Sequence, residues 1–308
     1  MDLLIGFSIL ACIYVILASS LNILIGYSGI FTMAQAAIFG VGAYSVALLE
    51  TKLGWGLIPA LIGAVIIAGV FSAVMAIPSL GVSGDYFIVA SFGLQMLLHT
   101  LFMNLDGLTN GPAGVQRIPR PEFFGYQLNS DLSYLIFSFI LTGLVLLFLV
   151  KISRTGFGRV LRAIKEDETV VESLGKSAKR SKVVATVLSG CVAAVAGGIY
   201  ANYVTYISPD SFTIHESIFI TQLIILGGLG SWKGATIGAI ILLGLPELLK
   251  FLPISPVYAA PLRQVFFGIL IIAFMILRPK GIFGTNMARE IKVKEPDVVV
   301  TLERRETI

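Results

Sequence analysis

The feature that most constrains the fold of this chain is a series of apolar stretches, most of them long enough to cross a membrane. Hydrophobic residues make up 56% of the 308 residues and charged residues only 13%, whereas a soluble domain carries about 25% charged residues. A helix needs roughly 20 apolar residues to span the hydrocarbon core of a bilayer. The sequence therefore predicts an all-α, polytopic membrane protein.

The apolar segments are separated by Gly, Pro and charged residues. They fall at 3–25, 29–50, 57–80, 84–104, 132–152, 183–206, 215–231, 233–252 and 262–279. Because short or re-entrant pieces are included, we expect about 8–10 transmembrane or re-entrant helices. The segment at 3–25 lacks a basic start and a clear cleavage site, so it is interpreted as a first membrane helix and not as a signal peptide. We predict one transmembrane domain over 1–284 and a polar tail over 285–308.

The loop 151–182 is the one long, densely charged stretch between apolar segments. It holds nine of the 22 Lys and Arg residues. A segment this charged must lie in water, and its basic excess places it in the cytoplasm by the positive-inside rule. The basic residues after Leu277 place the tail there too. Counting backwards through the segments puts Asp2 and the loop 105–131 on the outer side.

Within this loop, residues 157–174 show the pattern of an amphipathic surface helix. Val160, Ile164, Val171 and Leu174 recur at helical spacing. Gly175 is expected to end the helix, and the next residues restart one. The pattern also fits a solvated loop that serves topology alone. The length and order of the loop favour instead a docking surface for a soluble partner.

The tripeptide Gly175-Lys176-Ser177 raises the question of a phosphate-binding loop. Such a loop also needs a Gly where this chain has Val170, together with a preceding strand. We therefore expect no ATP or other cofactor on this chain itself.

Two glycine-rich segments, 22–44 and 225–249, share a plan of apolar lead, Gly cluster and small-residue helix. Paired, interrupted segments of this kind indicate an inverted repeat and a transport path near the midplane. The alternative is that the glycines permit close helix packing, as for Gly230, Gly234 and Gly238, or for Gly190, Ala194 and Gly198. The residues predicted to line the path are Asn22, Tyr27, Ser28, Gly29, Gln35, Gly227, Gly228, Gly230 and Ser231.

Other polar residues in the apolar segments are Thr32, Tyr44, Asp85, Gln95, His99 and Gln222. Each could equally be an interhelical hydrogen-bond partner. His99 and His215 lack metal-ligand spacing, so no metal site is expected. We find no nucleophile–base constellation, which argues against an enzyme.

Several motifs together resemble one transporter family. They are GRVLRAIKEDETVVESLG at 158–175 with the helix that follows it, the Gly-rich stretches 21–44 and 208–239, and RPKGIFG at 278–284. This combination, over about 20–285, resembles the branched-chain amino acid ABC transporter permeases, in particular the LivM-type subunit. Gln35 departs from the family pattern, which often has His there, and this leaves the choice of substrate open.

The resemblance implies an importer in a bacterial or archaeal inner membrane. Two ATPase subunits with ATP and Mg²⁺ would power it, an H-type permease subunit would pair with this chain, and a periplasmic binding protein would deliver the amino acid. Nucleic acid plays no part. The family's coupling helix would dock on the ATPase. Carried over to this chain, the role falls on Ala163, Glu166, Asp167, Glu168, Glu172, Leu174 and Gly175.

Two other functions fit the composition. A stand-alone secondary transporter would need a buried carboxylate or Arg near the midplane as its ion site, and the sequence shows no clear one. A permease for urea or small amides would carry similar motifs.

Overall fold

The computed structural model describes residues 2–77, 85–123, 126–127, 130–249, 268–269 and 281. Six of the described helices are long and apolar enough to cross a membrane. They are α1 (Asp2–Asn22) with its extension η1 (Ile23–Ser28), α2 (Gln35–Leu53), α3 (Leu57–Ala76), α5 (Asp85–Asn104), α7 (Asp131–Arg154) and α10 (Ala178–Val204). The predicted all-α polytopic class is confirmed.

The sequence predicted separate apolar segments at 215–231 and 233–252. In the structure these segments do not form two separate crossings. They correspond to α11 (Ile214–Gly227) and α12 (Trp232–Leu249), which meet at a bend of 119°. A helix of 14 residues such as α11 reaches only about 21 Å, less than the roughly 30 Å core of a bilayer. The pair is therefore a broken span or a re-entrant hairpin. The predicted segment 262–279 and the tail 285–308 lie outside the described residues.

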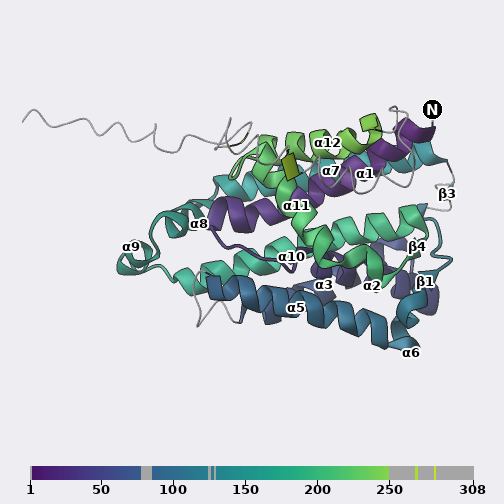
Figure 1. The fold of residues 1–308 in the computed structure, drawn as a ribbon, viewed down its shortest axis with the longest axis horizontal. Coiled ribbons are helices and arrows are strands. Elements are labelled where there is room, and N and C mark those ends of the chain that lie inside the picture. The colour runs from purple at the N-terminus through teal and green to yellow at the C-terminus, as the bar shows by residue number, and fades with distance from the viewer. Residues whose placement is uncertain are drawn as a thin grey trace, which may run out of the picture.

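Short elements cap the two ends of the helical body (Figure 1). One end carries the N-terminus, α6 (Asp106–Thr109), η2 (Gly111–Ala113) and η3 (Pro209–Phe212), with the antiparallel pairs β1 (Val115–Gln116)–β4 (Tyr206–Ile207) and β2 (Glu122–Phe123)–β3 (Tyr126–Gln127). The other end carries α8 (Gly156–Glu166) and α9 (Glu168–Ser173). Asp2 and the loop 105–131 thus lie opposite the charged loop, as the sequence predicted.

The centre of the body is the contact of α2 with α10, where small residues let two backbones meet. A Cβ at Gly42 would overlap Ala194, and a Cβ at Gly197 would overlap the backbone of α2. Gly190 faces Ser72, and Gly198 faces Leu61 and Val46. The packing interpretation of Gly190, Ala194 and Gly198 is therefore confirmed. By contrast, α3, α5 and α7 lie at the periphery with largely exposed apolar faces.

The single helix predicted over 157–174 is in fact two helices. Asp167 adopts an extended backbone, and its carboxylate accepts hydrogen bonds from the N–H groups of Thr169 (2.8 Å) and Val170 (3.2 Å). It therefore ends α8 and caps α9. The predicted stop is confirmed: Gly175 has φ +74°, and the Lys176 N–H reaches back to the Val171 carbonyl.

The apolar face of this loop also differs from the prediction in one position. Ile164 and Val171 are buried against the body, as their spacing indicated. Leu174, predicted to lie on the same face, is 74% exposed. The helix α9 ends at Ser173, so Leu174 lies just beyond it and does not continue the buried face that Val171 belongs to.

Candidate functional site

The first glycine break interrupts the chain after α1. The helix widens to the π-form over Ile23–Ser28 and stops at Gly29, whose φ of 72° is left-handed. Residues 29–34 are not helical, although Ile30, Thr32 and Ala34 among them are buried. Non-helical backbone at membrane depth is tolerated only where protein or a cavity surrounds it, so this stretch depends on partners from other helices.

Side chains from α5 and α11 satisfy the backbone at the start of α2. The N–H of Met33 donates to Ser91 Oγ (2.9 Å), that of Ala36 to Ser217 Oγ (2.9 Å), and that of Ala37 to Gln95 Oε1 (2.8 Å). These bonds replace the missing helical turn before α2. Ser91 and Ser217 were not singled out from the sequence, because a lone Ser in an apolar helix carries no signal.

Gln35 lies at the first position of α2 and is only 2% exposed. Its amide nitrogen donates to Ser20 Oγ of α1 at 2.7 Å. The side chain that departs from the family pattern thus ties two helices together. Its predicted place along the substrate path stays a prediction.

The second break, between α11 and α12, lies directly against the first. Gly228 and Gly230 have φ of 116° and 78°. Asn22 Oδ1 accepts a hydrogen bond from the Gly230 N–H (2.9 Å), and its amide nitrogen donates to the Ser231 carbonyl (3.1 Å). A Cβ at Gly26 would lie 2.5 Å from the Gly230 nitrogen. The structure therefore brings together the two Gly clusters that the sequence singled out.

Glycines also allow α11 and α12 to fold back on each other. A Cβ at Gly227 would overlap the Gly234 carbonyl, one at Gly234 would lie 2.6 Å from the Gly227 oxygen, and one at Gly238 would overlap the Leu223 carbonyl. The packing interpretation of Gly234 and Gly238 is thus confirmed. Gly227 serves close backbone approach as well.

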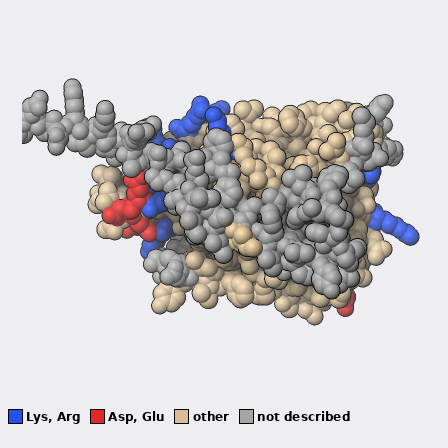
Figure 2. Space-filling model, turned by 45° about the horizontal axis from the view of Figure 1, so that its top comes forward, with Lys and Arg blue, Asp and Glu red and all other residues tan. Residues whose placement is uncertain are grey.

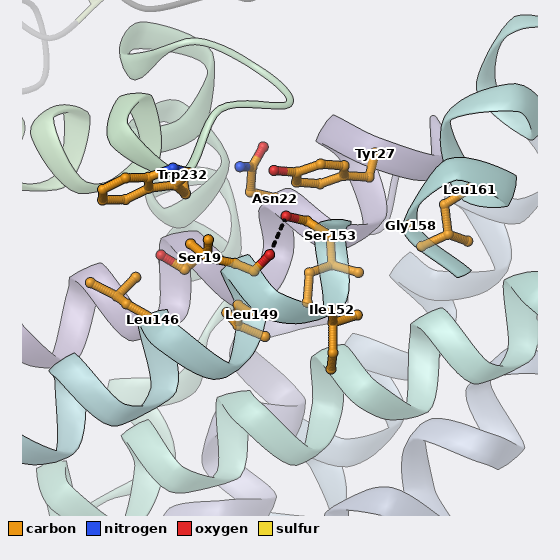
Figure 3. A pocket seen from close by; sticks show the side chains of 12 residues that line it. Ser19, Asn22, Tyr27, Leu146, Leu149, Ile152, Ser153, Gly158, Leu161 and Trp232 are labelled. Atoms are coloured by element: carbon orange, nitrogen blue, oxygen red, sulfur yellow. Dashed lines mark hydrogen bonds between the residues drawn. The ribbon is translucent and has the colours of Figure 1, made fainter. Parts of the chain in front are cut away.

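A small cavity lies where the first break faces α7, α8 and the start of α12 (Figure 3). Residues of α1 and η1, among them Asn22 and Tyr27, line one part of it together with Trp232. The end of α7 and the first half of α8 line the rest. Its volume of about 20 Å³ is the size of one water molecule, so an amino acid does not fit. The other predicted path residues do not line it: Ser28, Gly29, Gln35, Gly227, Gly228, Gly230 and Ser231.

One carboxylate is buried in the apolar helices and a second is partly buried, and the sequence analysis had singled out neither. Glu50 of α2 is 6% exposed, and its Oε2 accepts a hydrogen bond from Asn202 of α10 at 2.6 Å. Glu216 of α11 accepts one from the Tyr14 hydroxyl at 2.6 Å. Hydropathy averages over a window and passes over single acids near helix ends. Because each acid has a polar partner from another helix, its burial is compensated.

The residues predicted to contact the ATPase lie at the end of the molecule formed by α8 and α9. Ala163, Glu166, Asp167, Glu172, Leu174 and Gly175 are exposed. Figure 2 shows acidic side chains gathered at this end with basic side chains next to them. Glu168 differs from the others, because it forms an ion pair with Lys182 at 2.5 Å.

Two basic residues of α8, which the sequence analysis had counted only as loop charge, contact the first break. Lys165 Nζ donates to the Gly26 carbonyl at 2.9 Å. The Arg162 guanidinium lies 5.2 Å from the centre of the Tyr27 ring and donates to the Ser153 carbonyl at 3.0 Å. Partial burial lowers the pKa of Lys165, because removal from water disfavours the ammonium, and neighbouring Glu166 opposes this effect.

Comparison with known proteins decides the family. Residues 3–275 match the family described as branched-chain amino acid transport system / permease component. The chain belongs to this family of permeases. It is 31% identical over 297 residues to the high-affinity branched-chain amino acid transport system permease protein LivM of Escherichia coli, covering 89% of this chain and 68% of the relative.

Two further relatives of this permease extend the comparison. The corresponding LivM protein of Salmonella typhimurium is 29% identical, covering 88% of this chain and 67% of that protein. The permease protein LivH of Escherichia coli is 25% identical, covering 88% and 91%. No solved structure matches this permease. The family match and these relatives confirm the resemblance drawn from the motifs. Permease components carry solute and are not enzymes.

Proposed function

We propose that this chain is the LivM-type permease subunit of an ABC importer that moves branched-chain, hydrophobic amino acids across the inner membrane. The observation that carries the proposal is the family match over 3–275, together with relatives named for branched-chain amino acid transport. The two helix breaks in contact at Gly26 and Gly230 support it, since interrupted helices are typical of substrate paths in transporters.

The proposed assembly contains this chain, a LivH-type permease subunit, two ATPase subunits and a periplasmic binding protein. Similarity to both LivM and LivH proteins supports a pair of related permease subunits. The peripheral faces of α3, α5 and α7 expose many large apolar side chains, which suits contact with lipid and with a second subunit.

The ATPase subunits are proposed to dock on α8 and α9 from the cytoplasm. This surface combines exposed acids, such as Glu166 and Glu172, with the exposed apolar side chain of Leu174. An apolar anchor within a rim of charges is a common composition for a protein interface. Rigid-body motion of the ATPases could then be transmitted through α8 to the membrane helices.

The test is reconstitution of the four kinds of subunit in liposomes, with leucine uptake and ATP hydrolysis as readouts. The key variant is Glu172→Arg. We expect it to insert normally but to retain about tenfold less ATPase on co-purification, because a reversed charge at an interface is strongly unfavourable. Asp210→Arg reverses a charge in η3, next to the β1–β4 pair, and is the matched control that should retain the ATPase.

Glu168→Arg is also expected to insert but to uncouple transport. It is the less specific variant, because it would place an Arg next to Lys182, the present partner of Glu168. If Glu172→Arg and Glu168→Arg both kept full ATPase association and leucine uptake, the docking surface would be wrong. If the wild-type assembly took up no branched-chain amino acid, the proposed substrate would be wrong.

A further inference from the structure

The end of η1 presents a carbonyl group that its own helix leaves without a partner. The last carbonyls of a helix lack intrahelical donors and carry a partial negative charge. Gly26 is in this position, since the helix stops at Gly29 and the N–H of Ile30 returns to Leu24. A cationic donor is the group that best satisfies such a carbonyl.

Lys165 supplies that donor from a different part of the chain. Its ammonium donates to the Gly26 oxygen at 2.9 Å, across a separation of 139 residues. Its side chain also packs on the turn, because a Cβ added at Gly29 would lie 3.1 Å from Lys165 Cγ. Lys165 thus forms a hydrogen bond at the tip of its side chain and van der Waals contacts along its stem.

Arg162 adds a second attachment one turn earlier on the same helix. Its guanidinium faces the Tyr27 ring at 5.2 Å, within the range of a cation–π interaction. It also donates to the Ser153 carbonyl at the end of α7. Two side chains of α8 therefore hold one turn of η1.

Gly26 links this attachment to the second break. On one side its carbonyl accepts from Lys165, and on the other its Cα faces the Gly230 nitrogen. Asn22, one turn earlier, bonds Gly230 and Ser231, and Figure 3 shows Asn22 and Tyr27 close together beside Trp232. A displacement of α8 would therefore reach both interrupted helices through direct contacts.

We propose that Lys165 is a positioning residue that joins α8 rigidly to the broken stretch 23–29, so that ATPase movement at α8 is passed to the two glycine breaks. This inference rests on the proposed function. It assigns to Lys165 a role distinct from ATPase docking. Lys165 is exposed as well, but its ammonium bonds the permease backbone at Gly26, whereas the exposed acids Glu166 and Glu172 are proposed to contact the ATPase.

The first test measures leucine taken up per ATP hydrolysed in the reconstituted assembly. Lys165→Met keeps the apolar stem but removes the ammonium, and it should lower this ratio about tenfold, the scale of one hydrogen bond to a charged group. ATPase association should stay unchanged. Lys165→Arg should restore most of the ratio. Lys179→Met, which removes a charge from an exposed site at the start of α10, should leave it unaltered.

These outcomes separate the inference from the proposed function. A general loss of folded protein would lower uptake and hydrolysis together and leave their ratio unchanged. A wild-type ratio in Lys165→Met, or loss of bound ATPase from that variant, would overturn the inference while leaving the importer assignment in place. Absence of ATP-driven uptake in the wild-type assembly would instead refute the proposed function.

A disulfide provides the second test. A Cβ at Gly29 would lie 3.6 Å from Lys165 Cβ, a separation at which disulfides form. Gly29→Cys with Lys165→Cys, in a chain whose Cys12 and Cys191 are replaced by Ala, should cross-link on mild oxidation. If α8 and the stretch 23–29 move as one body, the oxidised protein should recover at least the uptake per ATP of its reduced form. Loss of uptake on oxidation, or failure to cross-link, would contradict the rigid joint.

Discussion

At the scale of single residues, a few polar side chains in this permease replace backbone hydrogen bonds that helix breaks remove. Asn22 bonds both the N–H of Gly230 and the carbonyl of Ser231. Gln95 does the same at the start of α2, accepting from Ala37 and donating to the Phe212 carbonyl. An unpaired backbone group at membrane depth is costly, so these side chains permit the breaks to exist.

We therefore expect Asn22→Leu to destabilise the folded permease. The substitution is close in size but leaves the buried Gly230 N–H and the partly buried Ser231 carbonyl without the Asn22 side chain, which should lower the free energy of unfolding by about 1–3 kcal/mol. The thermal unfolding midpoint in detergent measures the effect. Asn104→Leu, whose side chain bonds only the Thr100 carbonyl of its own helix, is the control and should change the midpoint little. Equal midpoints for the two variants would contradict the role of Asn22.

At the scale of elements, the packing of α11 against α12 depends on close approach of their two backbones. Gly227, Gly234 and Gly238 lie where any side chain would meet the opposite backbone. Elsewhere a glycine has no such role: a Cβ added at Gly143 of α7 would meet nothing within 4 Å. The same residue type thus has different consequences in a central element and in a peripheral one.

This contrast gives a matched pair of substitutions. Gly238→Ala should force α11 and α12 apart, at a cost of about 1–3 kcal/mol typical of overpacking. Gly143→Ala should be neutral, or stabilising by up to about 1 kcal/mol, because Ala favours the helix. Thermal unfolding in detergent compares the two. A Gly238→Ala protein as stable as Gly143→Ala would show that the bend tolerates a wider separation.

At the scale of the whole molecule, the chain places a charged loop and a Gly-rich loop at opposite ends of an apolar body (Figure 1). The loop 151–182 holds most of the basic excess, whereas 105–131 is lightly charged. From the positive-inside rule we propose that the body is oriented with α8 and α9 in the cytoplasm. The proposed docking of an ATPase on α8 and α9 depends on this orientation.

Cysteine labelling in intact cells tests the orientation. In a chain whose two native cysteines are replaced by Ala, Gly107→Cys should react with a membrane-impermeant maleimide added outside. Glu172→Cys should react only after the membrane is permeabilised. Both positions are exposed, and a Cβ at Gly107 meets nothing within 4 Å, so accessibility is set by the side of the membrane. The reverse pattern of labelling would invert the topology and exclude docking from the cytoplasm.

The sequence by itself determined the membrane class, the approximate positions of the six described spanning helices, the opposite placement of the two loops, and the stop at Gly175. These properties depend on hydropathy over one span or on residues within a few positions of one another. The apolar periodicity gave a wrong prediction at Asp167. It predicted one helix through 174, but Asp167 ends α8 there and caps α9.

The tertiary structure alone decided which groups meet. The 119° bend between α11 and α12, the bond of Lys165 to Gly26 across 139 residues, and that of Asn22 to Gly230 across 208 residues have no local signature. Many donors in the chain could satisfy a free carbonyl, and only the packing of the helices selects one of them. For this reason the glycine breaks were visible in the sequence, whereas their contact with each other and with α8 was not.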